Sequence, residues 1–246
     1  MNLGSYRSQS SRNGSAVMAF IFAFAIFLAM AAPVHAQLVK ISSDSFTNPE
    51  SEHKSEVEPD TYSWGSTMVA AFQVARVHDG GGADLGFATS TDGGKTWTQG
   101  LLPGLTVHYK KGTYSAASDA SVVYDAKHGV WLISSLPIGN LGVNIATSRS
   151  KDGLHWGKPI PVDSSGGDDK NWITCDNNAK SPFYGNCYTE WDSGTVFMST
   201  STDGGLTWVE QQSNTYNHLY GVCFGTNKAG TAVGWRGNIM RITTDE

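Results

Sequence analysis

Acidic side chains recur along this chain at nearly constant intervals. Asp60, Asp119 and Asp169 are separated by 59 and 50 residues, and an apolar, strand-like run follows each of them. Carboxylates gathered at one mouth of a channel would repel an anionic ligand and attract a cation such as Ca²⁺ through hard oxygen ligands. Glu58 and Asp168 would join the same ring. The alternative is that each aspartate accepts hydrogen bonds from backbone amides at the start of its own strand.

A second series has the same period and predicts tight turns. Its pattern is Ser-x-Asp-x-Gly-x-x-Trp after a strand-like run, with aspartates 60 and 51 residues apart. Asp-Gly supplies the positive φ of a tight turn, the Ser and Asp side chains bond turn amides, and the Trp packs over the turn. The residues are Ser90, Asp92, Gly94 and Trp97; Ser150, Asp152 and Trp156 in a copy one residue shorter; and Ser201, Asp203, Gly205 and Trp208. Two features in step to within one residue indicate one repeating structural unit.

The composition favours strands over helices. The 246 residues include 28 Gly and 8 Trp, and only 16% are charged, which suits short strands and turns and disfavours helix bundles. A hairpin unit of about 50 residues is typical of a β-propeller blade, so we predict an all-β propeller. The expected blades span 55–105, 115–165, 167–212 and a truncated 217–246. About four blades are the lower limit for a ring, so we expect an incomplete propeller whose open edges favour self-association.

The N-terminus has the pattern of a targeting segment. Arg7 and Arg12 precede an uncharged apolar run over 16–32, and small residues precede a cleavage site after Ala36. We therefore expect a signal peptide over 1–36 and a secreted or periplasmic protein, which meets a membrane only if this segment stays uncleaved. The formal net charge of −5 and the lack of a basic block argue against a nucleic-acid partner.

Export makes a disulfide chemically possible. Cys175 and Cys187 flank a segment that reads as a loop between two strands, so we predict a bond between them. Cys223 is then either buried and free or paired outside this chain.

The turn repeats carry a family resemblance. The segments 90–97, 150–156 and 201–208 resemble the Asp-box (BNR) repeats of sialidase-like β-propellers, and the resemblance covers about residues 55–210. The tail over 219–234 is more similar to the propellers of photosystem II assembly factors. Both resemblances imply an Asp-box propeller. In that family the box lies on outer hairpins, away from the ligand site.

The sialidase resemblance implies an acid, an arginine cluster for a sugar carboxylate, and a Tyr–Glu nucleophile pair. By position, Asp79 matches the acid/base, with Asp84 second, and Arg76 is the candidate carboxylate ligand. The alternative for Asp79 is a solvated Asp-Gly turn. The family's Arg-Ile-Pro motif is replaced by Tyr-Ser-Trp-Gly at 62–65, and only four arginines follow the signal segment. The residues therefore support the fold better than the reaction.

Other chemistries lack sequence support. No zinc-ligand spacing, nucleophile elbow or phosphate-binding loop is present, so no cofactor is expected beyond the Ca²⁺ considered above. Trp64 and Trp131 are candidates for stacking on a sugar at the channel mouth, with blade packing as the alternative.

Two functions follow. One is a secreted, glycan-directed, sialidase-like propeller, either a hydrolase or a binder. The other is a non-catalytic propeller that binds or scaffolds another protein. An arginine cluster facing Asp79 would favour the first, and an acid-lined channel without one would favour the second.

Overall fold

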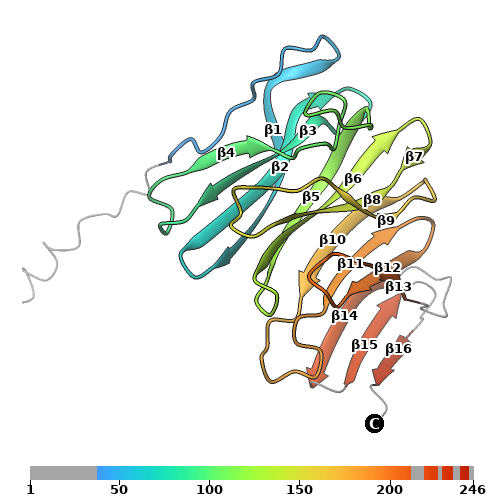
Figure 1. Cartoon of the computed structure of the whole chain (residues 1–246). Helices are drawn as coiled ribbons and strands as arrows, with labels where there is room; N and C mark the ends of the chain where they lie inside the picture. Colours follow the sequence, from blue (N-terminus) through green and yellow to red (C-terminus); the bar gives the residue numbers. More distant parts are fainter. Residues whose placement is uncertain (1–37, 212–218, 227–228, 235–238, 244–246) are drawn as a thin grey trace, which may run out of the picture. The chain divides into compact units, whose positions relative to one another are not determined.

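The computed structural model describes residues 38–211, 219–226, 229–234 and 239–243. Every regular element in these residues is a β-strand, and the strands form antiparallel sheets (Figure 1). The all-β part of the predicted fold class is thereby confirmed. The expected signal peptide over 1–36, with its cleavage site, lies outside the described residues.

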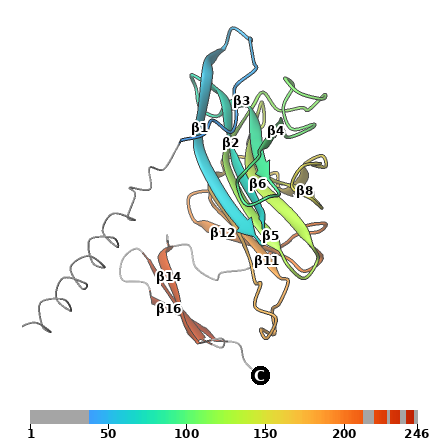
Figure 2. The ribbon, with the colours of Figure 1, turned by 90° about the vertical axis from the view of Figure 1, so that its left-hand side faces the viewer.

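The strands follow one another as meanders (Figure 2). The first and second meanders share one nine-stranded sheet through the pair Gly82–Ala117, whereas the third and fourth form sheets of four and three strands. The first consists of β1 (Ser51–Trp64), β2 (Thr67–Val77), β3 (Gly82–Ser90) and β4 (Thr98–Leu101). The second consists of β5 (Ala116–Asp125), β6 (Val130–Gly139), β7 (Gly142–Val143), β8 (Ile145–Ser150) and β9 (Ile160–Asp163). The third consists of β10 (Asp169–Cys175), β11 (Cys187–Asp192), β12 (Val196–Ser201) and β13 (Val209–Glu210), and the fourth of β14 (Leu219–Thr226), β15 (Ala229–Gly234) and β16 (Ile239–Thr243).

The middle strands of the first meander, β2 and β3, are buried on both faces. The β2 residues Val69 and Ala71 belong to one face and pack in a core that includes Trp131 and Ile133 of the second meander. On the other face Phe72 and its neighbours pack against the segment that precedes β1, through Ile41 and Phe46. A strand buried on both faces reads as a continuous apolar run, and this is why β2 is easy to recognise in the sequence.

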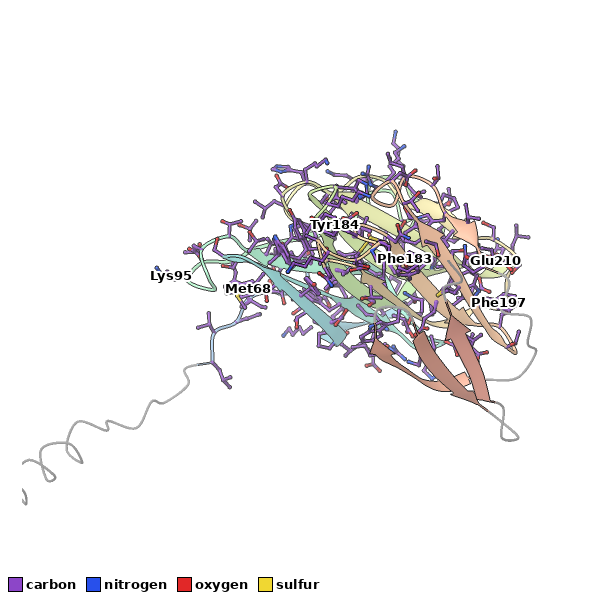
Figure 3. All side chains as sticks on the ribbon, turned by 90° about the horizontal axis from the view of Figure 1, so that it is seen from below. Met68, Lys95, Phe183, Tyr184, Phe197 and Glu210 are labelled. Carbon is purple, nitrogen blue, oxygen red and sulfur yellow. A yellow bond between two sulfur atoms is a disulfide. The ribbon has the colours of Figure 1, made fainter. Side chains whose placement is uncertain are left out.

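The Asp-Gly turns share one hydrogen-bond pattern. In the first turn Ser90 Oγ accepts from Gly94 N at 2.8 Å, and Asp92 Oδ1 accepts from the backbone N–H groups of Lys95 and Thr96 at 3.0 and 2.9 Å. The same serine and aspartate acceptors recur in the other two turns, at Ser150 and Asp152 and at Ser201 and Asp203. Figure 3 labels Lys95 of the first turn and Met68 of β2, whose sulfur would lie 3.6 Å from a Cβ on the turn residue Gly94.

The second and third turns also tie their meanders to the preceding ones. Thr89 Oγ1, at the end of β3, donates to Gly153 O in the second turn at 2.6 Å. Trp208 Nε1, after the third turn, donates to Thr147 Oγ1 on β8 at 3.0 Å, and Arg149 Nε donates to Gly204 O. The tryptophans of the first two turns instead donate to a glycine carbonyl of their own turn, at 3.1 and 3.0 Å.

The third meander contains a disulfide. Cys175 at the end of β10 is bonded to Cys187 at the start of β11, directly opposite it in the strand register. The bond closes the intervening loop, which carries Phe183 and Tyr184 (Figure 3). Of Cys223 the structure describes only its place in β14.

Candidate functional site

The first strands of three successive meanders, β1, β5 and β10, carry matching irregularities. The pairing with the next strand breaks between Val57 and Asp60, between Ser118 and Ser121, and between Asp169 and Trp172. Each break contains a non-glycine residue with positive φ: Glu58 at 52°, Asp119 at 47° and Lys170 at 48°. A β-bulge of this kind re-aims a side chain, and a non-glycine residue in this conformation costs of the order of 1 kcal/mol or more. Three equivalent strained residues, all charged, mark a candidate site.

The residues around these bulges form a continuous network. Arg76 Nη1 donates to Gln73 Oε1 at 2.6 Å and lies 3.5 Å from Glu58 Oε1. Gln73 Nε2 donates to Ser118 Oγ at 2.9 Å and to Glu58 Oε2. The network therefore links β1 and β2 of the first meander to β5 of the second.

From Ser118 the network reaches the third meander. Ser118 Oγ donates to Asp119 Oδ1 at 2.6 Å, and Lys170 Nζ lies 3.3 Å from Asp119 Oδ2. The six residues Glu58, Gln73, Arg76, Ser118, Asp119 and Lys170 are called the polar cluster below.

The polar cluster is graded from buried to exposed. Gln73 is fully buried and the side chain of Asp119 is 13% exposed, whereas the Glu58 side chain is 48% exposed and that of Lys170 is 76% exposed. The Asp119 carboxylate raises the pKa of Lys170, whose ammonium group is charged at neutral pH in any case. Two carboxylates and two cations give the cluster a formal charge of zero, with donors and acceptors interleaved.

The periodic aspartates do not form a ring of equivalent acids. Asp119 occupies the bulge position of its strand, whereas Asp60 lies two residues beyond the corresponding position and Asp169 one residue before it. The equivalent residues, Glu58, Asp119 and Lys170, are 61 and 51 residues apart, in step with the Asp-Gly turns. The sequence pattern thus aligned non-equivalent positions, because the polar strand β1 has no apolar run to reveal it.

Asp60 and Asp169 also have separate hydrogen-bond partners. Asp60 Oδ2 accepts from Val122 N at 2.8 Å and from Ser121 Oγ at 3.1 Å, both on β5. Asp169 is exposed, and its Oδ1 accepts from the adjacent Lys170 N at 2.9 Å. Asp60 therefore joins two meanders, while Asp169 bonds locally.

The candidate residues suggested by the sialidase resemblance lie in three different environments. Asp79 lies on the turn between β2 and β3 with its side chain 97% exposed, and its carboxylate contacts His78 Nδ1 at 3.1 Å. Arg76 points instead into the polar cluster. Asp84 is fully buried in β3, where desolvation raises its pKa well above the usual range. The structure describes the side chains of two arginines, Arg76 and Arg149. Arg149 donates to Gly204 O in the third turn, so no second described arginine joins Arg76 in a carboxylate-binding cluster.

The two tryptophan candidates lie in one aromatic stack. Trp64, at the end of β1, is 43% exposed and stacks on Tyr124, with ring centroids 5.3 Å apart. Trp131 is only 3% exposed and packs against Tyr124 and Tyr62. Its indole is enclosed by the core and offers no face to a sugar, so packing accounts for Trp131, whereas Trp64 keeps an accessible surface.

The residue types of the network escaped the sequence pattern. Gln73, Ser118 and Lys170 are common polar residues within or beside strand-like runs. The available signal was the spacing of 61 and 51 residues from Glu58 to Asp119 to Lys170, which matches the turns better than the aspartates do.

Among the described residues, no group of three or more His, Cys, Asp or Glu side chains is arranged to hold a metal ion. No helix in the described part of the chain could cross a membrane.

The fold and the cluster together define an all-β protein of successive antiparallel meanders with a polar site assembled from three of them. No protein-family model and no curated protein matches the chain. Solved structures with a similar backbone include a glycosyl hydrolase from Bacteroides ovatus, with a TM-score of 0.46 and 19% identity over 65% of this chain and 49% of that one. The α-L-arabinofuranosidase from Podospora anserina, solved with cellotriose, gives 0.46 and 15% over 82% and 66%, and the catalytic domain of the one from Coprinopsis cinerea gives 0.44 and 17% over 76% and 62%. The chain spans about half to two thirds of the length of these proteins, and at these scores the likeness carries no argument about activity.

Proposed function

We propose that the chain is a secreted, glycan-directed β-propeller of the Asp-box type, and that the polar cluster is its ligand site. Its blades would be the successive meanders, and β1, β5 and β10 would line the central channel. This proposal is supported by the repeated turns, of which the second and third join their meanders to the preceding ones. It is supported as well by the matching bulges in the three first strands.

The observation that carries the ligand class is the alternation of charge in the cluster. A carbohydrate hydroxyl both donates and accepts, so it can bridge neighbouring carboxylate and ammonium groups. Asp119 and Lys170, 3.3 Å apart, offer such a pair, and Glu58 and Arg76 offer another. A zero formal charge gives no net attraction to an anionic sugar. We therefore favour a neutral glycan over a sialic acid.

A hydrolase reading can be stated for the same residues. Glycoside hydrolysis in most families uses two carboxylates, one as acid and one as base or nucleophile. Glu58 and Asp119 are the two carboxylates of the cluster, and they replace Asp79 as the pair to test. Lys170 Nζ lies 3.3 Å from Asp119 Oδ2, and Asp119 is the carboxylate to test as the base or nucleophile.

The test is a glycan-binding screen of the purified chain, together with a panel of fluorogenic glycosides that includes a sialoside and neutral pyranosides and furanosides. The variants are Asp119→Asn and Lys170→Ala, and Asp79→Asn is the control. We expect neutral glycans to bind, the two cluster variants to weaken binding at least tenfold, and the control to bind as wild type. Binding of a sialoside alone, with sensitivity only to Asp79→Asn, would contradict the assignment. A folded protein that binds no glycan would leave the protein-binding scaffold as the better hypothesis.

A further inference from the structure

The loop that leads into β10 contains a buried carboxylate that the proposed glycan site does not use. Asp168 is only 3% exposed, and neither of its carboxylate oxygens has a donor in good hydrogen-bond geometry, although the Ser193 hydroxyl and the Trp191 indole are near enough to lower its pKa. Leaving a buried polar group without a partner is costly, and an ionised carboxylate costs more than a neutral one. Buried side-chain oxygens without a partner are rare in folded proteins, and a bound ion is one kind of group that can satisfy them.

The backbone around Asp168 is closely packed by glycines. Gly142, Gly166 and Gly167 all have positive φ, at 107°, 81° and 83°. A Cβ on Gly166 would lie 2.6 Å from Leu141 O, and one on Gly142 would lie 3.2 Å from Gly166 Cα. The loops 139–142 and 165–167 therefore approach backbone to backbone beside Asp168 in the sequence.

The surroundings of Asp168 fix its position. Its backbone N–H donates to Val143 O at 3.2 Å, and Ser193 Oγ donates to Gly167 O at 3.1 Å. Residues from β7, from the start of β10 and from the β11–β12 turn thus meet at this loop.

A second carboxylate, Asp163, lies beside Asp168. Burial, together with the neighbouring Asp163 carboxylate, raises the pKa of Asp168 to about 7, although Ser193 and Trp191 act in the opposite direction. Asp163 Oδ2 accepts from Ser165 N at 2.7 Å and from Ser165 Oγ at 2.6 Å, which holds that carboxylate at the end of β9. Among the neighbours that influence Asp168, no cation offsets the two acids.

We propose that Asp163 and Asp168 bind a Ca²⁺ ion, with backbone carbonyls of the glycine loops and water completing its oxygen shell. A hard divalent cation is the ligand that fits two carboxylates and peptide carbonyls without a nitrogen or sulfur donor. The ion would neutralise the buried pair and tie the loop before β10 to the preceding meander. This inference is independent of the proposed glycan function, since none of its residues belongs to the polar cluster.

The test is calcium titration of the chelator-treated, purified chain at pH 8, by calorimetry and by thermal melting. With two carboxylates we expect a dissociation constant on the order of 10⁻⁴–10⁻³ M and, at 10 mM Ca²⁺, a rise in melting temperature of roughly 3–6 °C. Asp168→Asn and Asp163→Asn should each abolish the rise, while the exposed control Glu52→Gln should keep it. At pH 5.5 the affinity should fall at least tenfold, because protons compete for the same oxygens.

Terbium luminescence gives a second readout that needs no change in stability. Trp191 is 3% exposed and lies close enough to Asp168 to influence its carboxylate, so it should sensitise a bound Tb³⁺ that Ca²⁺ then displaces. If Asp168→Asn does not fold, the more exposed Asp163→Asn still decides the question. A folded wild-type chain without calcium binding, or binding that survives both variants, would overturn the proposal.

Discussion

The Asp60 carboxylate can be removed to measure what holds the first two meanders together. Its Oδ2 accepts from Val122 N and Ser121 Oγ, and Val122 is 2% exposed, so that the stranded N–H could not reach water. A hydrogen bond to a charged group contributes about 1.5–3 kcal/mol, and an unsatisfied buried donor costs about 1–3 kcal/mol. The two energies partly describe the same loss and cannot simply be added, so we expect Asp60→Ala to lower the free energy of unfolding by about 2–4 kcal/mol.

The assay is urea unfolding followed by circular dichroism, with thermal melting alongside. For a chain of this size the loss corresponds to a fall of roughly 5–15 °C in melting temperature. Asp60→Asn keeps an oxygen acceptor and should lose only about 1 kcal/mol. Asp169→Ala is the matched control, since that exposed carboxylate bonds only the adjacent backbone N–H and should cost less than about 0.5 kcal/mol.

The comparison between the two alanine variants decides the outcome. Equal and small losses for Asp60→Ala and Asp169→Ala would refute the view that Asp60 bridges two meanders. A changed urea slope in Asp60→Ala would mean that the unfolded state or the cooperativity had changed, and melting in two steps would show that the meanders unfold separately.

Further predictions concern stability and pH. Burial raises the pKa of Asp203, but hydrogen bonds led by those of Thr207 lower it to about 2. Because the folded pKa lies below the unfolded value, the ionised carboxylate stabilises the fold fully above about pH 4, and this stabilisation is lost as the pH falls to 2. In acid titrations the difference in stability between wild type and Asp203→Asn should therefore disappear over that range. The pKa of Asp168 is raised instead, to about 7, so without Ca²⁺ its effect should destabilise the fold progressively from about pH 4 to pH 7; Asp168→Asn should therefore melt higher than wild type at pH 8 in chelator but not at pH 4. Reduction of the Cys175–Cys187 bond, with a sequence separation of 12, should lower the free energy of unfolding by about 3 kcal/mol, measured by urea unfolding with and without reductant. The control is a Cys175→Ser, Cys187→Ser variant, whose stability should not depend on reductant. Gly205→Ala should destabilise by about 1–3 kcal/mol, because φ is +78° and the new methyl would lie 2.7 Å from a Leu132 methyl, whereas Gly93→Ala, at a similar φ with open space, should cost only the conformational part; equal melting temperatures would contradict this.

The repeated unit could be predicted because its signals are local. The turns at Asp92, Asp152 and Asp203 depend on residues within eight positions of each other, and side chain and backbone satisfy one another there. The apolar run of β2 is similarly visible because burial on both faces leaves few polar positions. Pattern and structure therefore agree wherever a short stretch determines its own conformation.

The site could not be predicted in the same way because its signals are non-local. Gln73 and Ser118 are 45 positions apart, and nothing in either stretch reveals that they share a hydrogen bond. The strand β1 is polar along its length, so the pattern placed Asp60 before the apolar run of β2 and did not reveal that Asp60 itself lies in a strand. Trp131 was a candidate for sugar stacking until the fold buried it, since a tryptophan in a strand looks the same whether or not its ring is covered.

The three bulges have a consequence for how this protein can diversify. Glu58, Asp119 and Lys170 hold a backbone conformation that glycine or asparagine would adopt more readily, and the architecture supplies it three times over. The backbone conformation at these positions is therefore the same whether the side chain is glutamate, aspartate or lysine. Exchanges among them should change the charge pattern of the polar cluster while strand pairing is preserved, and glycine there should relieve the backbone strain and remove the charged side chain. In such a repeated scaffold the side chain at each of the three positions can change during evolution, while the backbone strain stays about the same.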